Sequence, residues 1–225
     1  MTKEAKPTRV SKLKRHAAEV IRRLHAEYPD AHTALDFETP LELLIATILS
    51  AQCTDVRVNI VTKTLFKKYR NAKDYVNASP EELDEDIQSI NFHRNKTRSI
   101  RGACKMIIEE FGGKVPQTME DLVKLPGVAR KTANVVLGTA FGIPAGMVVD
   151  THVKRVTFRL GITRETSPEK VERDLMKIIP KEDWIFGAHA LIWHGRQVCH
   201  ARKPDCDHCV LQDICPKCGV KEKRE

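Results

Sequence analysis

The chain has 225 residues, and its 38 Lys and Arg residues against 30 Asp and Glu residues give a formal net charge of +8. Charged residues make up 30% of the sequence, and no stretch approaches the roughly 20 apolar residues of a membrane-spanning helix, which excludes an integral membrane protein. Leucine, isoleucine and valine recur at helical spacing, which excludes a disordered chain. A basic chain suits a polyanionic partner, although charge alone does not identify it.

Most of the excess positive charge lies at the start of the chain. Residues 1–25 hold eight Lys or Arg and two Glu, a net charge of +6. Apolar residues from Val10 to Leu24 follow a helical period and predict an amphipathic helix there. The basic segment is interpreted either as a solubilising tail or as a contact to phosphate groups.

The sequence predicts where several helices begin. Thr39-Pro40 and Ser79-Pro80 are each followed by Glu two residues after the proline, which predicts capping boxes with proline at the first helical position. Only the run 146–149 is ambiguous between strand and loop. The sequence therefore predicts an all-α protein with about ten helices. Apart from the first, they are expected at 40–50, 55–69, 80–90, 95–111, 119–124, 130–141, 151–160, 168–179 and 184–195.

A tight turn between two short helices is predicted around residue 126. Pro126 cannot continue the preceding helix, and Gly127 can adopt a positive φ at little cost. The helix that follows begins with unpaired backbone N–H groups, which form an anion site suited to phosphate. The neighbouring Lys124 and Arg130 would strengthen it. The alternative is an ordinary turn that packs two core helices.

Five of the seven cysteines lie in the last 27 residues. Cys199, Cys206, Cys209 and Cys215 supply four closely spaced thiolates, which can hold an iron–sulfur cluster. A zinc site formed by Cys206, Cys209, Cys215 and Cys218 is the alternative. Its central gap of five residues is shorter than the usual gap of about 15–20, and it leaves Cys199 without a role, so the cluster is favoured.

The segment LPGVARKTANVVLGTAFGIP, the VDTHVKRV that follows it and SAQCTD at 50–55 resemble the helix-hairpin-helix DNA glycosylases of the endonuclease III family. The resemblance continues into the cysteines and covers most of the chain. It implies a [4Fe–4S] cluster as the cofactor. Ala129 stands where the family usually has glycine, and we expect this change to be tolerated.

The resemblance implies that Lys131 and Asp150 are the catalytic pair. Lys131 would attack C1′ of a damaged nucleotide, displace the base and form a Schiff base, after which β-elimination would cut the strand on the 3′ side. The amine must be neutral to attack, and we expect burial, Arg130 and the helix N-terminus to favour that form. Asp150 would activate the amine and stabilise positive charge on the sugar. On the residues alone, Asp150 is interpreted as the N-cap of a helix that begins at Thr151.

Further contacts to DNA are also implied by the resemblance. Gln52 would fill the space left by the extruded base, and Phe92, where relatives often have Leu, would act as a second wedge, with core packing as the alternative. Asn91 replaces a common glycine beside it. His152 is a candidate for the base pocket, with a helix-surface histidine as the alternative. The remaining expected DNA contacts are Leu125, Gly127, Ala129 and Arg130 in the hairpin, and Arg202 and Lys203 in the first cysteine gap.

The resemblance implies a six-helix barrel domain over 33–143, with the helix-hairpin-helix at about 118–141. A discontinuous cluster domain, 1–32 with 144–225, would lie beside it, with a cleft between the two. The expected function is that of a bifunctional DNA glycosylase/AP lyase of base excision repair, which acts on oxidised pyrimidines in duplex DNA. We expect a monomer with no membrane association, in the cytoplasm of a bacterium, with an organelle or nucleus as alternatives. The competing hypotheses are a non-catalytic DNA-binding module with a redox-sensing cluster and a zinc-ribbon regulator.

Overall fold

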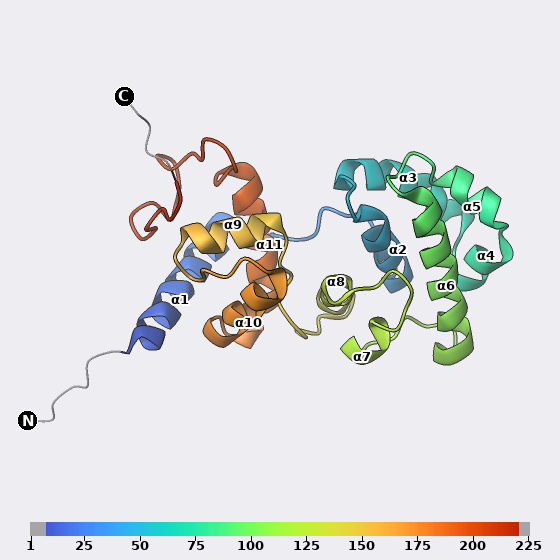
Figure 1. Cartoon of the computed structure of the whole chain (residues 1–225), viewed down its shortest axis with the longest axis horizontal. Helices are drawn as coiled ribbons and strands as arrows, with labels where there is room; N and C mark the ends of the chain where they lie inside the picture. Colours follow the sequence, from blue (N-terminus) through green and yellow to red (C-terminus); the bar gives the residue numbers. More distant parts are fainter. Residues whose placement is uncertain (1–7, 221–225) are drawn as a thin grey trace, which may run out of the picture. The chain divides into compact units, whose positions relative to one another are not determined.

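The computed structural model describes residues 8–220, and over this range all regular secondary structure is helical (Figure 1). This confirms the predicted all-α class. None of the described helices is both long and apolar enough to cross a membrane. The helices of the described range are α1 (Arg9–Glu27), α2 (Pro40–Ser50), α3 (Asp55–Lys68), α4 (Ala72–Asn77), α5 (Pro80–Asp86), α6 (His93–Phe111), α7 (Met119–Leu122), α8 (Arg130–Phe141), α9 (Thr151–Arg159), α10 (Pro168–Ile178), the 3₁₀-helix η1 (Lys181–Asp183) and α11 (Trp184–Gln197).

Some of the observed helices differ from the expected ones. Helix α4 was not expected, because its six residues are too few to show a helical period. Its start is defined instead by Asn71, whose side chain caps the helix together with Asp74. The helix expected over 80–90 ends at Asp86, and α6 begins at His93, two residues earlier than expected. The ambiguous run 146–149 is not a strand.

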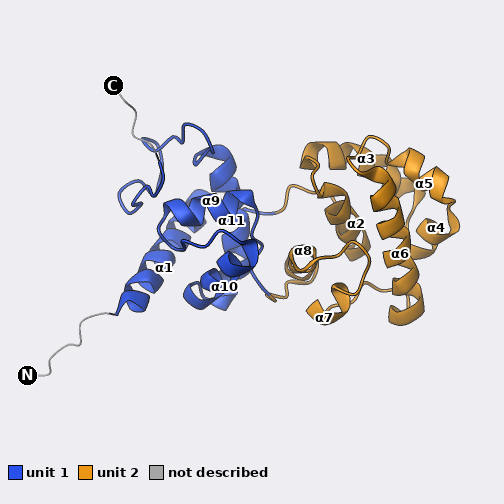
Figure 2. Ribbon diagram, in the orientation of Figure 1, with its two compact units in different colours: residues 1–32, 146–225 blue, residues 33–145 orange. Residues whose placement is uncertain are grey.

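The chain divides into two compact units, each with its own hydrophobic core (Figure 2). One unit is the continuous segment Thr33–Ala145 and contains α2 to α8. The other joins the residues up to His32 to those from Gly146 onward, and so contains α1 and α9 to α11. We call them the hairpin unit and the cysteine unit.

Helix α2 is the central element of the hairpin unit. Every residue from Leu43 to Leu49 is buried, and the helix packs against α3, α6 and α8. A helix that is apolar on all sides is stable only in such an interior position. The predicted capping box at Thr39 is confirmed, because the Thr39 hydroxyl accepts from the Glu42 N–H and the Glu42 carboxylate accepts from the Thr39 N–H. At α5 the Ser79 hydroxyl accepts from the Glu82 N–H, but the return bond of a capping box is not formed.

In the cysteine unit, α1 packs against α10 and α11, and α11 also packs against α9. The predicted amphipathic helix is confirmed, since α1 buries Ala17, Val20, Ile21 and Leu24 on one face. Helix α11 approaches α1 closely at Gly187, where an added Cβ would lie 2.9 Å from the Ile21 Cδ1 atom. Residues 1–7 of the basic segment lie outside the described residues.

Candidate functional site

The turn between α7 and α8 requires glycine at position 127. Gly127 has a φ of +81°, and an added Cβ would lie 2.7 Å from the Ser99 Cβ atom. Side chains rarely adopt that φ, and no Cβ fits so close to another, so both constraints exclude a larger residue. Ser99 lies on α6, which means that the predicted hairpin turn rests directly on this helix.

Helix α8 begins without a side-chain cap. Its N-cap residue, Ala129, has φ −87° and ψ 169°, an extended conformation that alanine adopts without strain. Alanine at this position therefore costs nothing in backbone conformation. Alanine offers no acceptor to the first N–H groups of α8, so an external anion can satisfy them. In the hairpin unit only α6 and α8 begin in this way, whereas α2 to α5 and α7 are capped by side chains.

Lys131 is the second residue of α8, and its side chain is exposed, as is that of Arg130. The burial that we expected to favour the neutral amine is absent in the described structure. The helix start at Arg130 follows from Pro126 and Gly127, which end the preceding turn, so the position of Lys131 at the N-terminus of α8 is determined locally.

Leu125 does not belong with the expected DNA contacts. Its side chain is 2% exposed and lies in the core of the hairpin unit. Its N–H donates to the Leu122 carbonyl, and its own carbonyl accepts from the Val128 N–H. Leu125 therefore stabilises the turn through its two backbone hydrogen bonds and through packing of its side chain in the core.

Asp150 is the N-cap of α9, as the residues alone predicted. Its Oδ1 atom accepts from the backbone N–H groups of His152 and Val153, both at 2.8 Å. Both capping bonds use the same oxygen, so the cap does not engage Oδ2. The side chain is half-buried. Asp150 belongs to the cysteine unit and Lys131 to the hairpin unit.

His152 is half-buried in the first turn of α9 and is held by Arg155. The Arg155 guanidinium lies 3.1 Å from His152 Nδ1, and it also donates to the carbonyls of Gly195 and Cys199. Because a guanidinium only donates, Nδ1 accepts, and the proton of the neutral ring is assigned to Nε2. On α11, an added Cβ at Gly195 would lie 2.8 Å from the His152 Cβ atom, so the two helices are in close contact here.

The two expected wedge residues lie on turns of the hairpin unit, and both are exposed. Gln52 follows α2, and Phe92 precedes α6 with 60% of its side chain accessible. Core packing is therefore the wrong interpretation of Phe92. Both residues have a positive φ, 55° for Gln52 and 59° for Phe92, which is unusual outside glycine. The Asn91 side chain donates to the Gln52 carbonyl at 2.7 Å and so joins the two turns.

The four cysteines of the cluster hypothesis line one cavity in the cysteine unit. Its other walls include the apolar side chains of Val156, Leu160 and Leu211, and Cys218 is not part of the lining. Sulfur atoms in the cavity receive hydrogen bonds, from the Leu211 N–H to Cys209 and from the Lys217 N–H to Cys215, both at 3.4 Å. Such N–H donors stabilise thiolates in iron–sulfur sites. The residues present therefore fit a cluster.

Burial is the main cause that raises the pKa of Cys209 and Cys215, and the neighbouring cysteines raise it further. Four thiolates in this cavity would repel one another, so they require the positive charge of a metal centre. Within residues 8–220, no three His, Cys, Asp or Glu side chains are grouped closely enough to hold a single metal ion. A cubane cluster does not need that grouping, because each thiolate binds a different iron.

His194 on α11 lies against the cavity in a chain of polar contacts. Its Nδ1 is 3.2 Å from the Tyr28 hydroxyl, and its Nε2 is 3.5 Å from the Cys209 sulfur. Burial lowers the pKa of His194 to about 4, and it is the main cause that raises the pKa of Tyr28 to about 12. At neutral pH the hydroxyl can therefore donate to Nδ1, which leaves the Nε2 proton directed toward Cys209.

The buried side chain of Arg159, which is 8% exposed, binds the loop between Cys199 and Cys206. Its guanidinium donates to the Cys199 sulfur at 3.2 Å and to the carbonyls of His200 and Ala201 at 2.7 Å and 3.1 Å. The following Arg202 and Lys203 are exposed. Arg202 and Lys203 therefore lie on the surface of a loop whose backbone is bound by Arg159.

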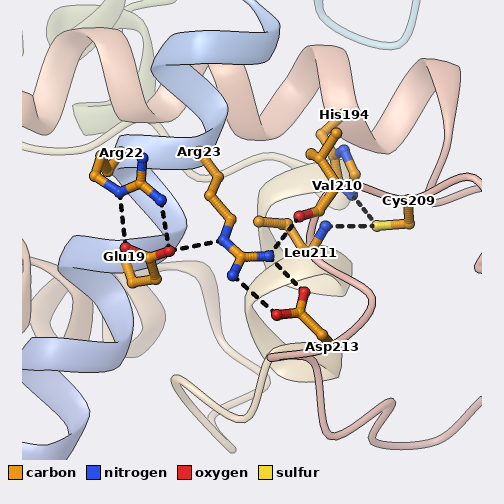
Figure 3. A network of polar contacts seen from close by, with 8 residues as sticks. All are labelled: Glu19, Arg22, Arg23, His194, Cys209, Val210, Leu211 and Asp213. Atoms are coloured by element: carbon orange, nitrogen blue, oxygen red, sulfur yellow. Dashed lines mark hydrogen bonds and ion pairs between the residues drawn. The ribbon is translucent and has the colours of Figure 1, made fainter.

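Arg23 joins α1 to the second part of the cysteine loop (Figure 3). It donates to the Val210 carbonyl at 2.9 Å and to both carboxylate oxygens of Asp213, at 2.5 Å and 2.9 Å. Its Nε donates to Glu19, which also pairs with Arg22 (Figure 3). These two arginines lower the pKa of Glu19 to about 2. The carboxylate is therefore charged at neutral pH and supports the network.

Comparison with known proteins agrees with this geometry. Residues 45–181 match the HhH-GPD superfamily of base excision DNA repair proteins, and residues 199–215 match the iron–sulfur binding domain of endonuclease III. Endonuclease III of Synechocystis sp. is 55% identical over 203 residues, which are 90% of this chain and 93% of the relative. The enzyme of Bacillus subtilis is 50% identical over 198 residues, which are 88% and 90% of the two chains.

The chain belongs to the endonuclease III family. A solved structure described as a trapped covalent intermediate of endonuclease III with DNA is 49% identical and superposes with a TM-score of 0.86. The superposition covers 91% of this chain and 96% of the chain in the solved structure. As a member of the endonuclease III family, the protein is a DNA glycosylase/AP lyase of base excision repair with a [4Fe–4S] cofactor.

Three buried polar residues of this chain were not expected from the sequence, namely Lys96, Arg159 and His194. For Lys96 a signal was present, because it precedes Ile100, Ala103 and Ile107 at helical spacing and so shares their buried face. What each residue would contact could not be inferred, because its partners come from other elements.

Replacing Arg23 with methionine should accelerate loss of the cluster. The substitution removes the bonds to Val210, Asp213 and Glu19 but keeps a long unbranched side chain. The measurement is the half-time for loss of the brown visible absorbance of the holoenzyme under a chelator. Arg22→Met, which alters only the pairing with Glu19, should decay like the parent. Equal half-times for the two variants would contradict the assigned role of Arg23.

Replacing Ala129 with aspartate should stabilise the protein and weaken DNA binding. Aspartate can cap α8, a gain of about 0.5–2 kcal/mol, but its charge then occupies the place of a phosphate. Thermal unfolding and DNA titration at fixed salt measure the two effects. Thr118→Asp, a cap exchange at the start of α7, should leave affinity unchanged. Parent-like affinity of the Ala129 variant would exclude a phosphate at this helix end.

Proposed function

We propose that Lys131 is the nucleophile of a bifunctional reaction on duplex DNA. The observation that carries this proposal is an exposed lysine in the first turn of an uncapped helix, directly after a hairpin suited to phosphate. A relative that is 49% identical is described as a trapped covalent intermediate with DNA. Such an intermediate requires a nucleophile on the protein, and an amine supplies one that forms an imine.

The proposed reaction proceeds in two stages. The neutral Lys131 amine forms a bond to C1′, the glycosidic bond breaks, and the base leaves with the bonding electrons and takes up a proton. Loss of a proton from nitrogen and opening of the sugar ring give the Schiff base. A proton then leaves C2′, and its electron pair expels the 3′ phosphate oxygen, which cuts the strand on the 3′ side. Hydrolysis returns the free amine.

Asp150 is proposed to activate the amine and stabilise the positive charge that develops on the sugar. Its Oδ1 is used to cap α9, which orients the carboxylate through two backbone N–H bonds. The oxygen outside the cap, Oδ2, is then available for electrostatic stabilisation. A carboxylate held by backbone groups needs no reorganisation during the reaction.

The substrate is proposed to be duplex DNA with an oxidised pyrimidine or an abasic site. Extrusion of a damaged base from the stack costs a few kcal/mol, and a side chain that fills the space reduces this cost. We assign that role to the exposed Gln52 and Phe92, and we place His152 in the base pocket. Backbone contacts to phosphate are assigned to Gly127, Ala129 and Arg130, and to Arg202 and Lys203 of the cysteine loop.

We propose Cys199, Cys206, Cys209 and Cys215 as the four cluster ligands. The cluster supplies a rigid, charge-compensated core for the loop. With that core in place, Arg159 holds the segment that carries Arg202 and Lys203. We further propose a monomer that acts on chromosomal DNA in a bacterial cytoplasm.

Borohydride should trap the protein covalently on duplex DNA that contains an abasic site, because reduction converts the imine to a stable amine. Lys131→Ala should abolish the trapped band on a denaturing gel. Lys124→Ala is the matched control, since Lys124 lies on the same hairpin but pairs with Asp121 at 2.8 Å. Trapping by the Lys131 variant would assign the nucleophile to another residue. No trapping by the parent would support a non-catalytic DNA-binding module.

Replacing Asp150 with asparagine should separate capping from catalysis. Asparagine is as good an N-cap as aspartate, so the melting temperature should stay close to that of the parent. Loss of the charge should slow single-turnover base excision by about 100-fold or more. Asp150→Ala should lose both functions and unfold with about 1 kcal/mol less stability. Full activity of the asparagine variant would limit Asp150 to the cap.

A further inference from the structure

Polar side-chain bonds connect the two turns that carry Gln52 and Phe92. Both residues are exposed and both have a positive φ, so neither the hydrophobic core nor the local backbone preference keeps them in place. Backbone bonds span each turn, from the Cys53 N–H to the Ser50 carbonyl and from the Asn95 N–H to the Phe92 carbonyl, and two polar side chains add further restraints.

One restraint is the buried ammonium group of Lys96. It donates to the carbonyl of Leu49 at 2.8 Å and to that of Ala51 at 2.6 Å. These carbonyls lie at the C-terminal end of α2, where the last carbonyl groups of a helix have no partner within it and carry partial negative charge. Lys96 is 6% exposed and lies on the first turn of α6. It therefore connects the residue that precedes Gln52 to the helix that follows Phe92.

The second restraint is the Asn91 side chain. Its amide group donates to the Gln52 carbonyl at 2.7 Å, from the position directly before Phe92. The bond fixes the peptide group of Gln52 relative to the residue that precedes Phe92. Glycine at position 91 could not make this bond, because the donor belongs to the side chain.

We propose that Asn91 and Lys96 are positioning residues, which hold Gln52 and Phe92 in the conformations that enter the DNA stack before DNA is bound. The inference rests on the proposed function of these two side chains. Without the restraints, the free energy needed to order both turns would be added to the cost of extruding the base. An abasic site has no base to extrude, so its cleavage depends less on the wedges.

The test compares two reactions of the holoenzyme under single-turnover conditions. These are excision of an oxidised pyrimidine from duplex DNA and cleavage of a preformed abasic site. The variants are Asn91→Ala and Asn91→Asp, since a carboxylate keeps the size of the side chain but cannot donate to a carbonyl. Lys96→Met removes the buried charge. The control is Asn59→Ala elsewhere in the hairpin unit, which removes an amide bond to the Ala34 carbonyl at 2.8 Å and a bond from the Asp36 N–H at 3.1 Å.

Both Asn91 variants should excise the base at least fivefold more slowly than the parent and cleave the abasic site within twofold of it, with unchanged melting temperatures. Lys96→Met should change the ratio of the two rates in the same direction. The fluorescence of 2-aminopurine opposite the lesion should show less unstacking with the Asn91 variants. Asn59→Ala should match the parent in both rates.

Parent-like base excision by Asn91→Asp would overturn the proposal. An equal loss of both rates, accompanied by a lower melting temperature, would also overturn it by reducing the bond to a structural role. Failure of the proposed function has a different signature, because the parent itself would then neither excise the base nor cleave the abasic site.

Discussion

The buried ammonium group of Lys96 is the interaction on which the hairpin unit depends. It joins the end of the central helix α2 to the start of α6 through the carbonyls of Leu49 and Ala51. Burial lowers the pKa of Lys96, and an unpaired cation in this position would cost several kcal/mol. The two carbonyls compensate that cost. The positive φ of Gln52 and of Phe92 costs roughly 1–3 kcal/mol for each residue, and the proposed restraints by Asn91 and Lys96 would offset this strain.

Helix α6 contacts both the hairpin turn and the end of α2 in the hairpin unit. Its first turn carries Lys96, one of the two residues proposed to position the wedges. Its middle carries Ser99, against which Gly127 packs, and Gly102, where an added Cβ would lie 3.0 Å from the Pro126 Cγ atom. The hairpin turn and the wedge turns therefore have a common rigid base. A displacement of α6 would move both together.

In the cysteine unit, too, buried or partly buried cations bind backbone carbonyl groups of a polar segment. A loop with few apolar residues cannot hold its own shape, because it buries too little surface to offset its conformational entropy. Arg159 and Arg23 supply bonds to its carbonyl groups from α9 and α1. Together with the cluster, they turn a flexible segment into a defined surface. In both units, cations bonded to carbonyl oxygens order the polar segments that are proposed to meet DNA.

The sequence by itself determined the helical class, the position of the hairpin, the cap at Asp150 and the grouping of the cysteines. These features depend on interactions between residues a few positions apart, and such interactions can be predicted from the sequence. Only the tertiary structure decided that Leu125 is buried, that Phe92 is exposed and that Lys96 bonds to the end of α2. These outcomes depend on which helices pack together, and their partners lie tens of residues away, where no local pattern identifies them.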